Sequence, residues 1–169
     1  MRCLPFKKFL VLSCLLLTAC GQDSNSIDEI TRLFEEDKSF FEPHANNTLA
    51  VVIIPRVGCS SCIGLADHFF QEVVDTSPKV KFVFTKIQSE KTLKIRLGKA
   101  RVMNQNVLLD KTGRYAQKEL DSWYPLLITM EEGKVKEVTT ITPKQKELIS
   151  ELKRELALTF NPNTNTNKF

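Results

Sequence analysis

The feature that most constrains the fold is a pair of cysteines placed between a strand pattern and a helix pattern. Residues 49–54 (LAVVII) form a continuous apolar run of strand-forming side chains, which is typical of a strand buried on both faces. Residues 55–61 predict a loop, and residues 62–76 carry apolar side chains at helical spacing. Cys59 and Cys62 therefore stand where a buried strand leads into a helix, which requires a sheet that is covered by helices.

The rest of the sequence continues this alternation of strand and helix patterns. The other predicted elements are helices at residues 27–41, 90–97 and 143–158, and strands at residues 80–87, 107–110, 126–130 and 135–139. The last two strands form a predicted hairpin, because Gly133 between them suits a tight turn. This order predicts an α/β domain with a mixed central β-sheet and helices on both faces.

The first twenty residues have the layout of an export signal. Arg2, Lys7 and Lys8 precede an apolar run at residues 9–17. That run is shorter than the roughly 18 to 20 apolar residues that span a bilayer as a helix. We therefore interpret residues 1–19 as a signal peptide rather than a transmembrane or buried core helix.

The sequence LTAC, which ends at Cys20, resembles the lipobox of bacterial lipoproteins. The resemblance implies cleavage before Cys20 and lipidation of its thiol, with residues 20–26 as a flexible tether. Several acyl chains would hold the protein firmly at a membrane, because each buried methylene contributes about 0.8 kcal/mol. The alternative is an ordinary signal peptide with a coincidental cysteine at the cleavage point.

Removal of the export segment changes both the charge and the cysteine balance. The 169-residue chain has 24 basic and 20 acidic side chains and a net charge of +4; without residues 1–19 it has 21 and 20, or +1. This balance gives no reason to expect nucleic-acid binding. Cys3 and Cys14 leave with the signal and Cys20 would carry lipid, so only the C-x-x-C pair remains for chemistry.

The start of a helix is a favourable place for a thiolate. Its unpaired N–H groups and the helix dipole stabilise the anion, so we expect the pKa of the Cys59 thiol to fall below about 8.5. Arg56 is expected to add to this effect. In an oxidising compartment the pair can form a Cys59–Cys62 disulfide, with Cys59 as the attacking sulfur and Cys62 as the resolving one. So short a loop constrains the unfolded chain little, which indicates reactive chemistry rather than a structural crosslink.

Two segments together resemble the thioredoxin superfamily: residues 49–62, and residues 123–128 (WYPLLI). The second is similar to the segment that opens the strand facing the C-x-x-C. The resemblance implies a thioredoxin-like fold, a cis peptide bond before Pro125, and a substrate groove lined by Tyr124 and Pro125. The layout is similar to that of membrane-tethered envelope members of the superfamily, with a domain at residues 27–158 and a disordered tail at residues 159–169.

Two departures from the family pattern leave two hypotheses for function. Gly58 stands where a Trp is usual, and Ile53 stands where a buried acid is usual. The first hypothesis is a lipid-anchored envelope thiol–disulfide oxidoreductase that faces the periplasm or the cell exterior. Its partners would be thiols or disulfides of exported proteins and an unidentified redox recycling partner. The second is a non-catalytic binding module with an inert disulfide. No metal or other cofactor is expected, because C-x-x-C supplies only two of the four ligands that zinc needs.

Overall fold

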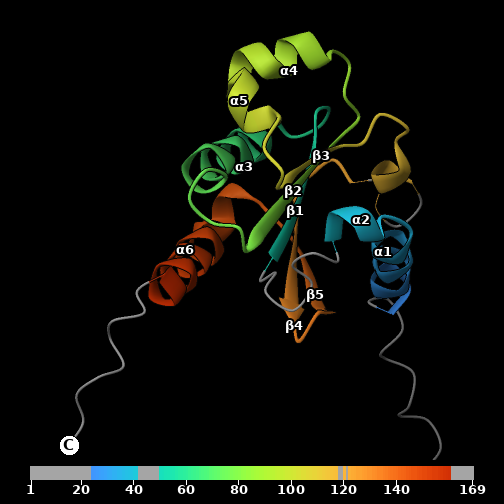
Figure 1. The fold of residues 1–169 in the computed structure, drawn as a ribbon, viewed down its shortest axis with the longest axis vertical. Helices are drawn as coiled ribbons and strands as arrows, with labels where there is room; N and C mark the ends of the chain where they lie inside the picture. Colours follow the sequence, from blue (N-terminus) through green and yellow to red (C-terminus); the bar gives the residue numbers. More distant parts are fainter. Residues whose placement is uncertain (1–23, 42–49, 118–119, 121, 161–169) are drawn as a thin grey trace, which may run out of the picture.

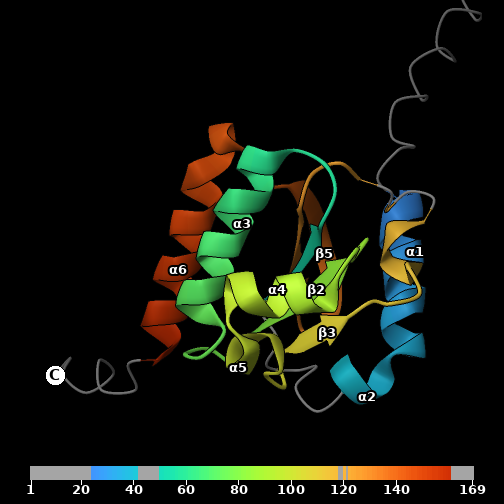
Figure 2. The ribbon, with the colours of Figure 1, turned by 90° about the horizontal axis from the view of Figure 1, so that it is seen from above.

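Helices cover both faces of a central β-sheet in the computed structural model of the protein (Figure 1). The structure describes residues 24–41, 50–117, 120 and 122–160. Seen from above in Figure 2, α3 (Ser60–Val73) and α6 (Lys146–Phe160) lie on one side of the strands, and α1 (Ser24–Glu36) lies on the other. The predicted α/β fold, with a mixed sheet and helices on both faces, is therefore confirmed.

The strand predicted ahead of the cysteines is the centre of the sheet. β1 (Ala50–Pro55) pairs in parallel with β2 (Val80–Thr85) and antiparallel with β4 (Leu126–Glu131). At the edges, β3 (Val107–Leu109) runs parallel to β2, and β5 (Lys134–Thr140) runs antiparallel to β4. The strand order is thus β3-β2-β1-β4-β5.

Alternate residues of β1 contribute to two separate apolar cores. Val52 and Ile54 belong to the core under α3 and α6, whereas Val51 and Ile53 belong to the core on the opposite face. Each of these side chains is at most 1% exposed. Burial of one such side chain contributes about 1.5–3 kcal/mol, so a continuous apolar run is what this central position requires.

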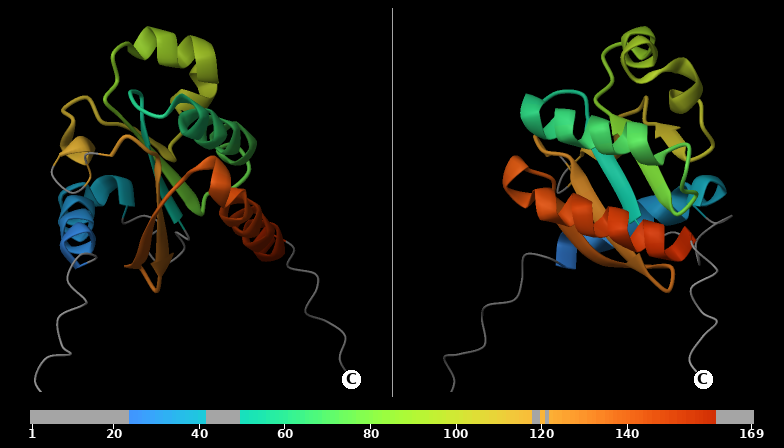
Figure 3. Two further views of the ribbon diagram at one scale, coloured as in Figure 1. Left: turned by 180° about the vertical axis from the view of Figure 1, so that it is seen from behind. Right: turned by 90° about the vertical axis from the view of Figure 1, so that its left-hand side faces the viewer.

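Apolar stripes on the helices complete the two cores. On α3, Phe70 lies edge-on to Phe82 and Phe84 of β2, with ring centroids 5.0 and 5.1 Å apart. The other helices supply these residues: Ile149, Leu152 and Leu156 from α6, and Ile30, Leu33 and Phe34 from α1. Figure 3 shows α3 and α6 side by side in front of the strands.

The segment between β2 and β3 has the predicted helix and one more. α4 (Glu90–Leu97) has the predicted bounds, and Ser89 caps it by accepting a hydrogen bond from the Thr92 N–H at 3.2 Å. A second short helix, α5 (Lys99–Val102), follows after Gly98. A single turn of 3₁₀ helix, η2 (Arg114–Ala116), follows β3.

The N-terminal helix differs from its prediction at both ends. α1 begins at Ser24, so three residues of the expected tether are helical. The helix breaks at Asp37 and resumes as α2 (Lys38–Phe41). At this break the Asp37 carboxylate accepts hydrogen bonds from Arg114 at 2.5 Å and from the Tyr115 hydroxyl at 2.7 Å, which join the two helices to the turn after β3.

The C-terminal half agrees closely with the predicted hairpin and helix. β4 and β5 are joined by a two-residue turn in which Glu132 and Gly133 have φ values of +51° and +76°. Glycine adopts this left-handed conformation without strain, which is why the turn forms there. The final helix opens with a 3₁₀ turn, η4 (Pro143–Gln145), before α6. Residues 159 and 160 are helical, whereas the rest of the expected tail lies outside the described residues.

The predicted signal peptide, Cys20 and residues 21–23 also lie outside the described part of the chain. Within residues 24–160, as far as they are described, no helix has the length and apolar character needed to cross a membrane.

Candidate active site

The Cys59–Cys62 pair lies where β1 leads into α3. The Arg56 N–H donates to the Thr85 carbonyl at 3.0 Å, which extends the pairing of β1 with β2 one residue beyond the strand. Cys59 then takes the N-cap position of α3, with an extended backbone (φ −64°, ψ 103°). Its sulfur accepts a hydrogen bond from the Cys62 N–H at 3.4 Å. A sulfur thus fills the place that Ser, Thr, Asp or Asn usually takes at a helix start.

The two sulfurs differ strongly in their exposure. They form a disulfide, with an S–S distance of 2.18 Å and a Cα–Cα distance of 5.3 Å. Cys62 is 1% exposed, because it lies within the first turn of α3, whereas Cys59 is only half-buried. The Ser61 hydroxyl lies 3.4 Å from the Cys59 sulfur and adds a second polar neighbour. Solvent and other proteins therefore have access to the pair from the side of Cys59.

The structure brings the second predicted segment directly against the cysteine loop. The Cys59 N–H donates to the carbonyl of Trp123 at 2.9 Å. The Trp123 side chain is 67% exposed and that of Tyr124 is 43% exposed, while Pro125 is buried beneath them. Two exposed aromatic side chains thus belong to the segment whose backbone is hydrogen-bonded to Cys59.

The close contact with the Trp123 backbone also explains why residue 58 is a glycine. Gly58 has φ +142°, and a Cβ built on it would lie 2.2 Å from the Trp123 carbonyl oxygen. No side chain fits so close a contact. The departure from the family pattern at this position is therefore required by the packing of residues 58 and 59 against Trp123.

The predicted cis peptide bond before Pro125 is wrong. No peptide bond among the described residues is cis, and the bond between Tyr124 and Pro125 is trans. The trans form is favoured by about 0.5–1 kcal/mol for a bond before proline. Hydrogen bonds hold the segment on both sides of this bond, from Cys59 N–H to Trp123 and from Ile141 N–H to the Pro125 carbonyl at 2.7 Å.

Arg56 does not approach the cysteine sulfurs as the sequence predicted. Its guanidinium pairs with both carboxylate oxygens of Asp67 on α3, at 2.6 and 3.3 Å, and lies 5.7 Å from the centre of the Phe84 ring. Arg96 of α4 pairs with the same carboxylate at 3.1 Å. Asp67 therefore pairs with both arginines and holds the Arg56 guanidinium against α3.

Asp67 is a site residue that the sequence analysis missed. It is 5% exposed, and it stands on the otherwise apolar face of α3 that carries Ile63, Ala66 and Phe70. A charged residue at such a position needs a partner of opposite charge, which is the signal that would have identified it. No acid stands at position 53, where Ile53 is 1% exposed in the core under α1.

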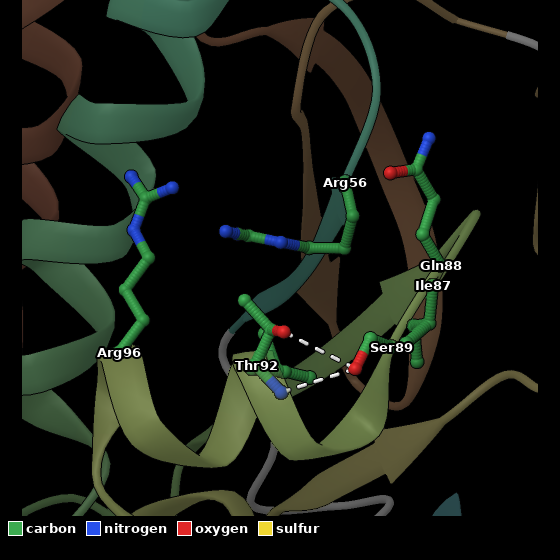
Figure 4. Close-up of a pocket in the computed structure, with 7 residues that line it drawn as sticks. Arg56, Ile87, Gln88, Ser89, Thr92 and Arg96 are labelled. Atoms are coloured by element: carbon green, nitrogen blue, oxygen red, sulfur yellow. Dashed lines mark hydrogen bonds between the residues drawn. The ribbon is translucent and has the colours of Figure 1, made fainter.

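Between these groups lies a pocket of about 180 Å³, which Figure 4 shows at the ends of β1 and β2. Arg56 reaches across it from β1 and Arg96 rises from α4 (Figure 4). The remaining lining residues are Ile87, Gln88, Ser89, Thr92 and Leu93. No group of three or more His, Cys, Asp or Glu side chains is placed to hold a metal ion within the described parts of the chain.

Comparison with known proteins gives no family for this chain. No protein-family model matches it, and no curated protein matches its sequence. Among solved structures it is similar to the crystal structure of a peroxiredoxin-like protein from Aquifex aeolicus, at 14% identity over 64% of this chain and 72% of that chain, with a TM-score of 0.39. A similarity this distant carries no information on activity or substrate, so the function has to be inferred from the site itself.

Proposed function

We propose that the protein is a thiol–disulfide oxidoreductase of the bacterial cell envelope, which exchanges disulfides with exported proteins through Cys59. One observation carries this proposal: a half-buried sulfur caps α3 and accepts the Cys62 N–H, with its partner sulfur buried behind it. A helix N-terminus stabilises a thiolate, and the thiolate is the nucleophile in disulfide exchange. The exposure of the two sulfurs supports Cys59 as the attacking residue.

In the reducing direction the exchange has two steps. The Cys59 thiolate attacks one sulfur of a substrate disulfide; the substrate S–S bond breaks, and the leaving thiolate takes a proton from solvent. Cys62, after loss of its proton, attacks the Cys59 sulfur of the mixed disulfide and releases the second substrate thiol. The substrate gains two electrons and two protons, and the protein is left as the Cys59–Cys62 disulfide. A dithiol reductant is needed to regenerate the pair, and the same steps in reverse oxidise a substrate dithiol.

A second function is favoured by the apolar surroundings of the buried sulfur. With Ile53 in place of an acid, and with Asp67 engaged by two arginines, neither residue is placed to relay a proton from Cys62. A thioredoxin-fold binding module with an inert disulfide has the same geometry. The two functions differ in one property, which is whether Cys59 forms mixed disulfides.

A trapping experiment separates these two functions. In a Cys62→Ala variant, expressed with its own N-terminal segment, Cys59 has no resolving partner and should accumulate mixed disulfides with exported proteins. Non-reducing gels followed by mass spectrometry would identify the adducts. The matched control is the Cys59→Ala variant, in which the remaining thiol is buried and should trap far less. A Cys62→Ala protein that stays free of adducts would favour the inert module.

The envelope location rests on the N-terminal sequence and has its own test. We propose that residues 1–19 direct export and that Cys20 carries the lipid anchor. The Cys20→Ala variant should then leave the membrane fraction, whereas the parent protein fractionates with membranes. Membrane association that is unchanged in Cys20→Ala would contradict lipidation.

A further inference from the structure

The pocket shown in Figure 4 has an unusual balance of charges for its size. Two of its seven lining residues are arginines, two carry hydroxyls, one carries an amide, and no carboxylate lines it among the described residues. Asp67 lies behind the arginines and not in the lining. Two positive charges and one negative charge leave the region with a net charge of +1, which favours an anionic occupant.

Asp67 fixes the arginines without using all of their hydrogen bonds. A guanidinium carries five N–H donors; Asp67 accepts two hydrogen bonds from Arg56 and forms an ion pair with Arg96 at 3.1 Å. The Arg56 side chain is 10% exposed and therefore held rigidly, whereas that of Arg96 is 55% exposed and open to a ligand. A rigid guanidinium with spare donors is suited to bind a planar carboxylate through paired hydrogen bonds.

The pocket and the cysteine pair share one edge of the sheet. Both lie at the carboxyl ends of the parallel strands β1 and β2, which is where open α/β sheets bind their ligands. Arg56 precedes Cys59 by three residues, so their Cα atoms lie at most about 11 Å apart. An extended peptide advances about 3.3 Å per residue. A peptide whose cysteine reacts at Cys59 can therefore reach the pocket with a side chain two or three residues away.

We infer that this pocket, which we call the arginine pocket (Arg56, Gln88, Ser89, Thr92 and Arg96), binds a carboxylate of the substrate. The inference rests on the proposed exchange at Cys59 and names its substrate class: protein segments with an acidic residue two or three positions from the reacting cysteine. Arg96 and Arg56 bind the carboxylate, and Asp67 positions both guanidinium groups. A small free carboxylate has the same chemistry, and the experiment separates these two sources.

The test uses two synthetic peptides that differ only by Glu or Gln two residues from a cysteine, each activated as a mixed disulfide with 2-thiopyridine. Attack of the reduced protein's Cys59 on the peptide sulfur releases 2-thiopyridone, which is followed by its absorbance. Cys62 then closes the protein disulfide and releases the peptide thiol. We expect the Glu peptide to react about tenfold faster than the Gln peptide, because a charge-assisted pair with arginine forms only with Glu.

Two variants decide whether the preference belongs to the pocket. In Arg96→Gln the ratio of the two rates should fall close to one, and in Arg96→Lys, which keeps the charge but not the planar donor pair, it should be intermediate. The matched control is Arg101→Gln, which removes one charge from neighbouring α5, where Arg101 pairs with Asp75 at 2.9 Å outside the pocket. A ratio that survives in Arg96→Gln, or that falls equally in Arg101→Gln, would overturn the inference.

A binding measurement keeps this test separate from the exchange activity. The oxidised protein is titrated with a cysteine-free Glu peptide and with glutarate, and the amide resonances of Gln88, Ser89 and Thr92 are followed. Saturable shifts with the peptide that are lost in Arg96→Gln support the pocket even if Cys59 proves unreactive. Equal affinity for glutarate would assign the pocket to small carboxylates instead of protein segments, and no shift with either probe would refute it.

Discussion

Two arginine–aspartate ion pairs lie on opposite sides of the sheet and have different roles. Arg114 and Asp37 are 77 residues apart in sequence, and their pair joins the break between α1 and α2 to the turn after β3. Arg56 and Asp67 are 11 residues apart, and their pair joins the loop before Cys59 to α3. The chemistry is the same, but the surroundings are not.

The two pairs differ in the third group that contacts each aspartate carboxylate. The Asp37 carboxylate also accepts a hydrogen bond from the buried Tyr115 hydroxyl, so its oxygens are bound by groups of the domain itself. The Asp67 carboxylate also pairs with Arg96, and the guanidinium groups of Arg56 and Arg96 both face the arginine pocket. A pair that is closed by the protein's own groups holds the fold together. A pair that retains spare donors at the edge of a cavity is available for a ligand.

The largest loss of stability is expected from Asp67→Ala. The side chains of Asp67 and Arg56 are 7% and 10% exposed, so the change leaves a buried guanidinium without its counter-ion. Removal of one partner of such a pair costs about 3–5 kcal/mol in the free energy of unfolding. Urea unfolding of the parent protein and the variant measures this difference. A loss below about 1 kcal/mol would show that solvent replaces the carboxylate and that the pair is not rigid.

Asp37→Ala should cost less, about 2 kcal/mol, because Arg114 is 39% exposed and can turn to water. Most of the loss comes from the Tyr115 hydroxyl, which is left buried without its 2.7 Å partner. The same unfolding experiment measures it, and Cys59 reactivity should be unchanged, since this pair lies away from the arginine pocket. If Asp37→Ala remains folded but loses Cys59 reactivity, the claim that the Arg114–Asp37 pair is only structural would be contradicted.

Tyr115→Phe should cost about 1 kcal/mol near neutral pH and should change the alkaline limb of stability. Burial, together with the Asp37 carboxylate, raises the pKa of Tyr115 above its ordinary value of 10.0. The folded state thus keeps a proton that the unfolded chain loses near pH 10, so this stability is fully present below that pH and is lost as the pH rises above it. Unfolding free energies from pH 8 to 11 should therefore fall more steeply for the parent than for Tyr115→Phe. Parallel curves would contradict the buried hydrogen bond.

The smallest loss of stability is expected at an exposed ion pair, which serves as a reference for the three variants above. Arg101 and Asp75 lie 2.9 Å apart with side chains 44% and 50% exposed. Exposed pairs of this kind contribute about 0.2–1 kcal/mol, so Arg101→Gln should fall at the lower end of that range and lose its effect in high salt. A loss as large as that of Asp37→Ala would mean that exposure does not explain the ranking of the pairs.

The sequence predicts the features that depend on local pattern. The apolar run of β1, the bounds of α4 and the hairpin turn at Gly133 all follow from periodicity and turn chemistry, and the structure confirms them. The helix start at the cysteines was predicted two residues late, because Cys59 replaces a usual capping residue and its sulfur gave no capping signal.

The features that were missed depend on partners far apart in the sequence. The need for glycine at position 58 comes from the backbone of Trp123, and the direction of Arg56 is set by Asp67 on the next helix. No local pattern contains either contact. The cis bond before Pro125 was expected from the family resemblance alone, and it is the part of the site that the structure corrects.

The central claim, that Cys59 and Cys62 form a redox-active pair, is tested most directly by a redox titration of the purified protein. The protein is equilibrated with dithiol buffers of known potential, its free thiols are alkylated, and the products are counted by mass. We predict one two-electron transition between about −270 and −120 mV, the range of thiol–disulfide oxidoreductases, with Cys59 alkylated first after reduction. A pair that stays oxidised below about −300 mV, as structural disulfides do, would contradict the claim.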